Sequence, residues 1–271
     1  MGWWQRFKSG LAQNPNDKPA KRDPISVQKP SNNNFGVVLK QDTPEESKAI
    51  SPVTLRYFDK PIFIDIETTG LHSDDRIVSI SILRCNYKED KSAIGIVNLV
   101  FDPLKKSHPM AENVHKLDDW MLRHQELFGE YVDAIGQIIE ECDCIIAHNA
   151  KFDVSFLERE FQRWGKVFPK KPIFCTMTEA SAQGWYPVNL AACARRLNIE
   201  RQSSQHLAVE DAIMCMSLWR HWLGLNPVAI DPAKWPKFTN MLPIPERPAE
   251  LPRRNNKKKL AIFSQKQLEE G

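Results

Sequence analysis

The sequence of 271 residues lacks several features that would assign it to a class at once. It has no uninterrupted apolar run of about 18 residues, so no membrane-spanning helix is expected. Residues 1–10 carry charges and two tryptophans but no apolar stretch with a cleavage site, so we expect no secretory signal. Arg6 stands where a myristoylation motif needs serine or threonine. Membrane, secreted and collagen-like classes are therefore excluded.

Cysteine is scarce, and its spacing fits neither a metal site nor a disulfide framework. The chain has six cysteines, no two of them form a C-x-x-C pair, and most lie inside apolar segments. This pattern is typical of reduced, buried side chains and not of a disulfide framework or a zinc site. It favours a cytoplasmic protein.

The net charge of +3 conceals an uneven distribution along the chain. Residues 1–57 hold nine Lys and Arg against five Asp and Glu, and residues 225–271 hold the same numbers. Of the totals of 37 and 34, this leaves 19 basic and 24 acidic residues for residues 58–224. Basic ends beside an acidic centre predict that the ends contact a polyanion and that the centre holds clustered carboxylates. Solubilising tails on an ordinary domain explain the same pattern equally well.

Composition and periodicity divide the chain into three parts. Residues 1–57 are rich in polar residues and proline without sustained periodicity, which predicts a disordered basic N-terminal segment. Residues 225–271 combine frequent prolines with a basic cluster, which predicts a disordered, Pro-rich, basic C-terminal tail. Residues 58–224 are long enough to bury a substantial core as one domain.

In the central part, short β-rich runs come first and helical patterns later. We expect strands over residues 61–67, 76–85, 92–101, 142–147 and 173–175. Helices are expected over residues 111–128, with a break near residue 117, and over 130–141, 152–164, 189–197 and 208–223. Strands that open as a hairpin and then alternate with helices predict an α/β fold, with a mixed five-stranded sheet flanked by helices.

Two carboxylates, Asp65 and Glu67, end the first expected strand. Side chains two residues apart in a strand point to the same face, so these two lie side by side. Their repulsion raises one pKa unless a cation neutralises them, and hard cations such as Mg²⁺ or Mn²⁺ take ligands of this kind. Two solvated acids at a strand end are the alternative interpretation. The residues 68–70 that follow form a polar exit whose backbone donors could approach a phosphate.

Two further motifs follow later in the chain. Asp153 comes shortly after the strand 142–147, in the first turn of the next expected helix, where an acid often only caps the helix. His206 and Asp211 are five residues apart, which puts them on different faces of a helix. They can share a site only if His206 precedes the helix, and the polar residues 202–205 favour that. A loop histidine is otherwise most often a surface residue.

In chain order the motifs D-x-E, H-N-x-x-F-D and H-x-A-x-x-D resemble those of the DEDDh 3′→5′ exonucleases, especially the proofreading epsilon-subunit family of bacterial DNA polymerase III. The matching stretches are FIDIETTGL at 63–71, IAHNAKFDVSFL at 146–157 and HLAVEDA at 206–212. The resemblance covers about residues 58–224. It implies an RNase H-like fold, two Mg²⁺ or Mn²⁺ ions per active site, and release of nucleoside 5′-monophosphates from a 3′ end.

Roles can be carried over at the matching positions. The resemblance implies that Asp65, Glu67, Asp153 and Asp211 bind the metal ions and that His206 is the general base. Glu67 also has an expected catalytic contact with the terminal 3′-hydroxyl. The substrate-binding residues implied in the same way are Thr68, Thr69, Gly70, Leu71, His115, Asn149 and Phe152.

Two positions depart from the family pattern. Lys116 stands where the family usually has a glycine near the terminal nucleotide, which puts the shape of the substrate pocket in question. Cys175 stands where the family often has an aspartate outside the metal set.

A metal-dependent 3′→5′ exonuclease acting on a free 3′ end of nucleic acid, with DNA as the expected substrate, is the function that the sequence favours. An RNA or short-oligonucleotide exonuclease is one alternative, and a non-catalytic nucleic-acid-binding module with the same fold is another. An interaction scaffold built around the basic tails is a third. The tails could also recruit a replication or repair complex, and no membrane partner is expected.

Overall fold

The computed structural model describes residues 58–84, 95–203, 207–228 and 237–270. In this part of the chain five strands form one mixed sheet in the order β3-β2-β1-β4-β5. β1 pairs with β2 in antiparallel fashion and with β4 in parallel fashion. The strands are β1 (Pro61–Thr68), β2 (Ile77–Arg84), β3 (Gly95–Val100), β4 (Cys144–Ala147) and β5 (Ile173–Cys175). The predicted α/β class, strand number and opening hairpin are confirmed.

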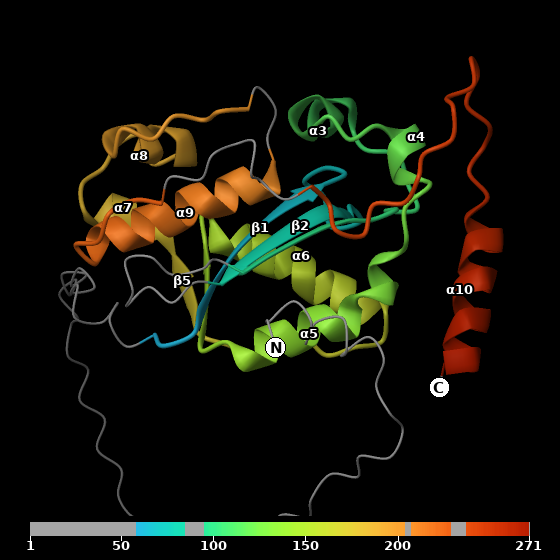
Figure 1. Ribbon diagram of the computed structural model, residues 1–271, viewed down its shortest axis with the longest axis horizontal. Helices are drawn as coiled ribbons and strands as arrows, with labels where there is room; N and C mark the ends of the chain where they lie inside the picture. Colours follow the sequence, from blue (N-terminus) through green and yellow to red (C-terminus); the bar gives the residue numbers. More distant parts are fainter. Residues whose placement is uncertain (1–57, 85–94, 204–206, 229–236, 271) are drawn as a thin grey trace, which may run out of the picture.

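Helices cover both faces of the sheet (Figure 1). The predicted break near residue 117 separates α3 from α4, and a short 3₁₀ helix, η1 (Phe128–Glu130), precedes α5. The helix α7 directly after β5 was not predicted, because its seven residues carry too short an apolar pattern. The helices are α3 (Pro109–His115), α4 (Asp119–Leu122), α5 (Val132–Glu141), α6 (Ala150–Arg163), α7 (Thr176–Ala182), α8 (Leu190–Arg196), α9 (Ala208–Trp222) and α10 (Asn256–Glu270).

The central strand β1 separates two apolar layers. Its isoleucines at 62, 64 and 66 pack in one buried cluster with side chains of α5 and α6. Phe63 points the other way and packs edge-to-face on Trp219 of α9, with ring centroids 5.5 Å apart. Burial on both faces explains why the strand reads as a nearly continuous apolar run. Asp65 and Glu67 alternate with the isoleucines and therefore share the face that α9 covers.

The prediction of a disordered C-terminal tail is wrong for residues 237–270, which we call the C-terminal strap. The strap runs along the outer edge of β3 before α10 begins. The backbone N–H of Thr239 donates to the Asn98 carbonyl at 2.9 Å. The side chain of Asn240 accepts from the Val100 N–H at 2.9 Å and donates to the Val100 carbonyl at 2.7 Å. These bonds satisfy edge-strand groups that a lone sheet edge leaves unpaired.

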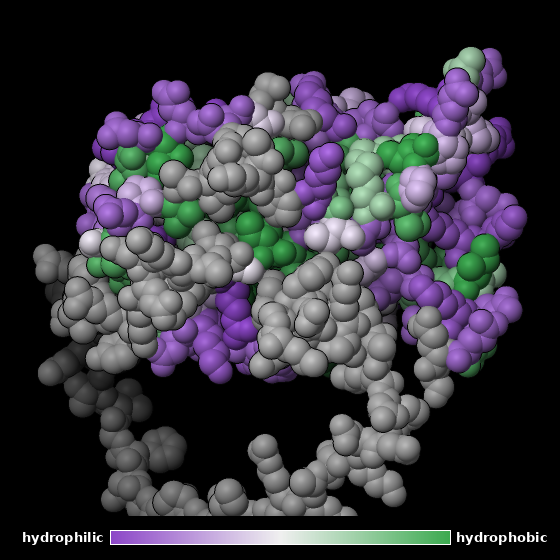
Figure 2. Space-filling view, in the orientation of Figure 1, coloured by the Kyte–Doolittle hydropathy of each residue, from purple (hydrophilic) through white to green (hydrophobic). Residues whose placement is uncertain are grey.

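Ion pairs fix the rest of the strap. Arg254 contacts Asp102 at 2.5 Å and Asp119 at 2.7 Å, and Lys259 contacts the other oxygen of Asp102 at 2.7 Å. Both acids are buried, so their charges need these partners. Phe263 of α10 adds an edge-to-face contact with Trp164 at 4.9 Å. In the space-filling view the exposed side of the strap is largely hydrophilic with isolated apolar side chains (Figure 2). A basic, Pro-rich composition is therefore compatible here with order.

The predicted N-terminal segment, residues 1–57, lies outside the described residues, and the domain boundaries at residues 57 and 224 stay predictions. No helix in the described ranges combines the length and the apolar character that crossing a membrane requires.

Candidate active site

Three acids from two elements meet above β1. Asp65 and Glu67 project from β1 toward α9, and α9 carries Asp211 in its first turn. Carboxylate oxygens of these three residues all lie within 4.8 Å of one another. The strand places two of them side by side and helix packing adds the third, so residues about 145 positions apart share one small volume.

A fourth acid stands close by. Asp153 lies in the first turn of α6, as predicted, and only 3% of its surface is exposed. It is not one of the three residues whose oxygens lie within 4.8 Å, but its charge raises the pKa of both Asp65 and Glu67. Burial raises the pKa of Asp153 itself. The four predicted metal carboxylates therefore belong to one electrostatic cluster.

Burial and mutual repulsion make this carboxylate cluster unfavourable without cations. Burial is the main cause that raises the pKa of Asp65, and the charges of Asp211, Asp153 and Glu67 add to it. The pKa of Glu67 is raised to about 8, first by burial and then by Asp211. Hard oxygen donors at this density fit divalent ions such as Mg²⁺ or Mn²⁺, whose positive charge would relieve the repulsion.

Within the described ranges a cation, Arg201, touches the cluster, and sequence reasoning missed it. Arg201 places Nη2 2.5 Å from Oδ1 of Asp211 and Nη1 3.7 Å from Oε2 of Glu210. Glu210 in turn accepts hydrogen bonds from the backbone N–H groups of Gln202 at 2.5 Å and Ser203 at 3.4 Å. The first turn of α9 therefore holds the loop that contains Arg201. Nothing in the sequence marks this arginine beyond its place in a polar loop near the last motif.

His206 lies outside the described residues. The helix α9 begins at Ala208, two positions after it. The prediction that the histidine precedes the helix agrees with this boundary. Its position relative to the carboxylates, and its role as a base, stay predictions.

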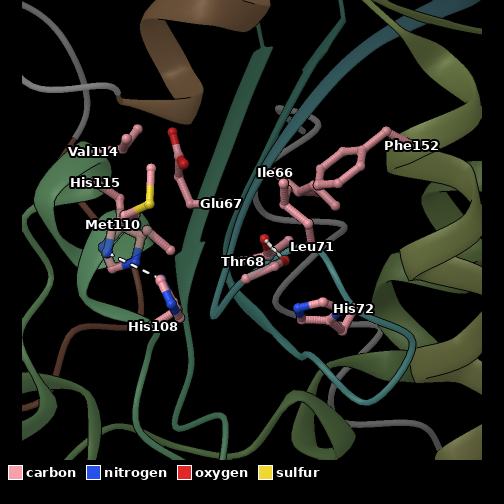
Figure 3. A pocket seen from close by; sticks show the side chains of 12 residues that line it. Ile66, Glu67, Thr68, Leu71, His72, His108, Met110, Val114, His115 and Phe152 are labelled. Carbon is pink, nitrogen blue, oxygen red and sulfur yellow. Dashed lines mark hydrogen bonds between the residues drawn. The ribbon is translucent and has the colours of Figure 1, made fainter.

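A pocket of about 420 Å³ opens beside Glu67. Figure 3 shows side chains of α3 on one side, Leu71 and Phe152 on the opposite side, and Glu67 between them. Leu71 and Met110 are 81% and 75% exposed, which is unusual for large apolar side chains. The pocket is therefore an apolar slot that ends at a carboxylate.

Most of the predicted substrate-binding residues line this pocket, namely Thr68, Gly70, Leu71, His115 and Phe152. Thr69 and Asn149 are not among its lining residues. Thr69 is fully buried and donates its hydroxyl hydrogen to Asp75 at 2.6 Å. Asn149 is exposed at the start of α6, where its φ is 64°. Thr69 therefore acts on the shape of the loop, and Asn149 on the start of the helix.

Asp75 fixes the loop that carries Leu71. It accepts hydrogen bonds from the Thr69 hydroxyl, the His72 N–H at 2.9 Å and the Lys105 ammonium at 2.9 Å. Burial works to raise the pKa of Asp75, but these donors prevail and hold it at about 2. Gly70 allows the close approach, because a Cβ there would lie 2.4 Å from a carboxylate oxygen of Asp75.

His115 is a neutral hydrogen-bond donor in the pocket wall. It is 1% exposed, and burial lowers its pKa to about 4. Its Nδ1 accepts the Leu117 N–H at 3.0 Å, so the ring proton is on Nε2. Nε2 has no hydrogen-bond partner among the described residues. At neutral pH this buried N–H therefore belongs to the pocket wall.

Lys116, which stands where the family usually has a glycine, affects the backbone conformation and does not line the pocket. Lys116 ends α3 with φ of 58°, the left-handed conformation that glycine adopts most readily. Its ammonium donates to the side chain of Asn113 at 2.5 Å, and the residue is not among those that line the pocket beside Glu67. A glycine suits this position for conformational reasons, and the lysine keeps the geometry at an energetic cost.

Lys116→Gly is accordingly expected to stabilise the protein. The left-handed conformation costs a non-glycine residue about 1–2 kcal/mol, and the greater freedom of glycine in the unfolded chain offsets about half of that. We expect a gain of about 0.5–1 kcal/mol in the free energy of unfolding, measured by urea titration. As a control, Glu158→Gly at an exposed position inside α6 should lose about 1 kcal/mol. Equal losses in both variants would contradict the expected gain.

Comparison with known proteins gives consistent matches. The exonuclease family model RNase_T matches residues 62–219. The DNA polymerase III subunit epsilon of Escherichia coli K12 is 27% identical over 172 residues, which cover 56% of this chain and 67% of that protein. The subunit epsilon of Treponema pallidum is 29% identical over 163 residues, 57% of this chain and 72% of that protein. A 3′-5′ exonuclease DinG of Staphylococcus epidermidis is 27% identical over 115 residues, which cover 42% of this chain and 12% of that protein.

Solved structures show the same fold at low sequence identity. The nuclease domain of 3′hExo, a DEDDh family member bound to rAMP, has a TM-score of 0.52 and 12% identity over 62% of this chain and 93% of that one. The E. coli ExoI–ssDNA complex has a TM-score of 0.52 and 15% identity over 60% of this chain and 40% of that one. These likenesses confirm the predicted RNase H-like fold.

Proposed function

The chain belongs to the exonuclease family whose model matches residues 62–219, and on this premise we propose that it is a metal-dependent 3′→5′ exonuclease. Its proposed substrate is a free 3′ end of nucleic acid, with DNA favoured over RNA as its identity, and its products are nucleoside 5′-monophosphates. The observation that supports this function best is the convergence of Asp65, Glu67 and Asp211 beside an apolar pocket. Binding alone does not require such a group of acids, which disfavours a non-catalytic module.

The carboxylate cluster would hold two divalent ions, with Asp65, Glu67, Asp153 and Asp211 as ligands. Ions bound there supply Lewis acidity to the attacking water and charge stabilisation to the scissile phosphate. The residues themselves contribute fixed negative charge at a site that excludes part of the solvent. His206 is the proposed general base, since an unperturbed imidazole pKa near 6.5 lets it accept a proton at neutral pH.

The pocket would receive the terminal nucleotide. Leu71 and Phe152 offer apolar contact to a base, and Glu67 can accept a hydrogen bond from the 3′-hydroxyl. His115 adds one N–H donor through Nε2. Because the lining has few polar groups that read base edges, this pocket would bind different bases with similar affinity.

Nucleic acid beyond the terminal nucleotide would meet the remaining basic residues. Arg254 and Lys259 of the strap pair with acids of the domain, whereas Arg253, Lys257 and Lys258 are exposed. These exposed cations and the basic residues of 1–57 are the candidates for contact with a phosphate backbone or with a replication or repair complex.

Labelled oligonucleotides test the function. The full chain with Mn²⁺ or Mg²⁺ is expected to release mononucleotides at once from a 3′-labelled strand and to shorten a 5′-labelled strand stepwise. Excess EDTA should abolish both. Activity that survives EDTA, or early release of the 5′ label, would contradict the mechanism. Matched DNA and RNA strands decide the substrate, and binding without hydrolysis would favour the non-catalytic alternative.

A further inference from the structure

Arg201 is a cation inside a group of acids that the proposed function assigns to metal ions. Its guanidinium contacts Asp211 at 2.5 Å, and Asp211 is one of the three residues whose oxygens lie within 4.8 Å. Its positive charge also lowers the pKa of Asp65 and Glu67, against the larger effect of burial. Arg201 therefore acts on Asp65 and Glu67 as well as on its direct partner Asp211.

The contact is well shielded and short. The side chain of Arg201 is 17% exposed and that of Asp211 is 8% exposed, so little water screens the pair. The guanidinium of Arg201 brings a positive charge to this shielded contact. It also uses an oxygen of a carboxylate that metal binding would need. Arg201 and a divalent ion therefore compete, both for a ligand and by repulsion between like charges.

The backbone around Arg201 can stay in place while the side chain of Arg201 moves away from Asp211. Gln202 and Ser203 are held by their N–H groups on the carboxylate of Glu210, at 2.5 and 3.4 Å. Glu210 is 3% exposed and belongs to the first turn of α9. The loop is anchored there independently of Asp211, and rotation of one long side chain is enough to free the aspartate.

We propose that Arg201 is a competing counterion: it offsets part of the negative charge of the carboxylate cluster when divalent ions are absent and yields Asp211 when they bind, so that it lowers metal affinity. This inference rests on the proposed function, because it requires the cluster to be a metal site. The opposite role, in which Arg201 orients Asp211 for the metal, predicts the opposite effect of removing it.

Metal titration of the full chain without nucleic acid separates the two roles. Arg201→Gln is expected to bind Mn²⁺ about tenfold more tightly than the wild type in isothermal titration calorimetry, since a charge-assisted contact no longer competes. Arg201→Lys keeps the charge but replaces the planar guanidinium with a compact, more strongly hydrated ammonium, and we expect binding about threefold tighter. Arg195→Gln makes the same charge change on an exposed face of α8 and should bind like the wild type.

Thermal unfolding gives a second readout that does not depend on activity. Metal-free Arg201→Gln should unfold a few degrees below the metal-free wild type, because the acids lose their counterion. Mn²⁺ should then raise the melting temperature of Arg201→Gln by more than it raises that of the wild type. If Arg201→Gln does not fold, the Mn²⁺ affinity of Arg201→Lys is compared with that of the wild type, and this comparison tests the inference. Equal or weaker Mn²⁺ binding by the variants overturns the inference, whereas absence of any binding by the wild type overturns the proposed function.

Discussion

Asp65→Asn and Asp211→Asn are each expected to reduce mononucleotide release by a factor on the order of 10³ or more. Each change removes a negative charge and a hard oxygen ligand from a group of three that lies within 4.8 Å. An amide oxygen is a weaker ligand, so the variant should lose metal ions at concentrations that saturate the wild type. Single-turnover release from a 3′-labelled strand measures the effect.

The fold of these variants should remain intact, and Asp65→Asn should even unfold at a higher temperature than the metal-free wild type. Burial and the charges of Asp211, Asp153 and Glu67 raise the pKa of Asp65, so its ionised form destabilises the folded state. Asp133→Asn is a matched control, because that side chain is 74% exposed and its ion pair in the described part of the chain is with Lys166 at 2.7 Å. A rate near that of the wild type in Asp65→Asn would remove the residue from the metal set.

The metal-free protein is expected to lose stability as the pH rises, and Mn²⁺ is expected to restore it. The folded-state pKa of Glu67, about 8, lies above its ordinary value of 4.5. A raised pKa means stability that is full below pH 4.5 and is lost as the pH rises through 8. The pKa values of Asp65 and Asp153 are raised too, so both acids act in the same direction.

The best window for this measurement is pH 6.5 to 8. The lowered pKa of His115, about 4 against an ordinary 6.5, makes stability rise with pH up to slightly above 6.5, so its contribution is mostly complete at the start of this window and opposes the loss only slightly. Asp75, with a pKa of about 2, is ionised in both states. Glu67 alone should then cost about 1.6 kcal/mol across the window, because the slope of about 1.4 kcal/mol per pH unit flattens as the pH approaches the folded-state pKa.

Urea titrations at pH 6.5 and pH 8, in EDTA or in Mn²⁺, measure this loss of stability. The stabilisation by Mn²⁺ should be larger at pH 8, because the ions bind the ionised acids. Glu67→Gln should remove much of the slope seen in EDTA. A metal-free stability that is flat or rises over this range would show that the carboxylate cluster is already neutralised by other means.

The convergence of the acids was the part of the site that could be predicted. The period of two along β1 predicts that Asp65 and Glu67 share a face, and α9 lies on that face with Asp211 in its first turn. The exit from β4 predicts Asp153 at the start of α6. These are local relations between neighbouring residues, and the resemblance of the motifs supplied the long-range step.

What could not be predicted depends on contacts between distant segments. Arg201 is one basic residue in a polar loop until α9 brings Asp211 within 2.5 Å of it. The strap reads as a solvated tail because its partners, the edge of β3 and the buried carboxylates Asp102 and Asp119, lie more than 100 residues earlier in the chain. A composition rich in proline and lysine indicates the conformation that a segment prefers in water, and it does not indicate which surface of the domain the segment packs on.

The hydrogen bonds of Thr239 and Asn240 to β3 matter when the chain is shortened to residues 62–219, the range that the family model matches. A fragment that stops at residue 219 would leave the backbone groups of Asn98 and Val100 on the edge strand β3 without the strap, and they could pair with β3 of a second molecule. Such a fragment should precipitate or elute as an oligomer from a sizing column. That oligomer would result from the truncation and would not report the quaternary structure of the full chain.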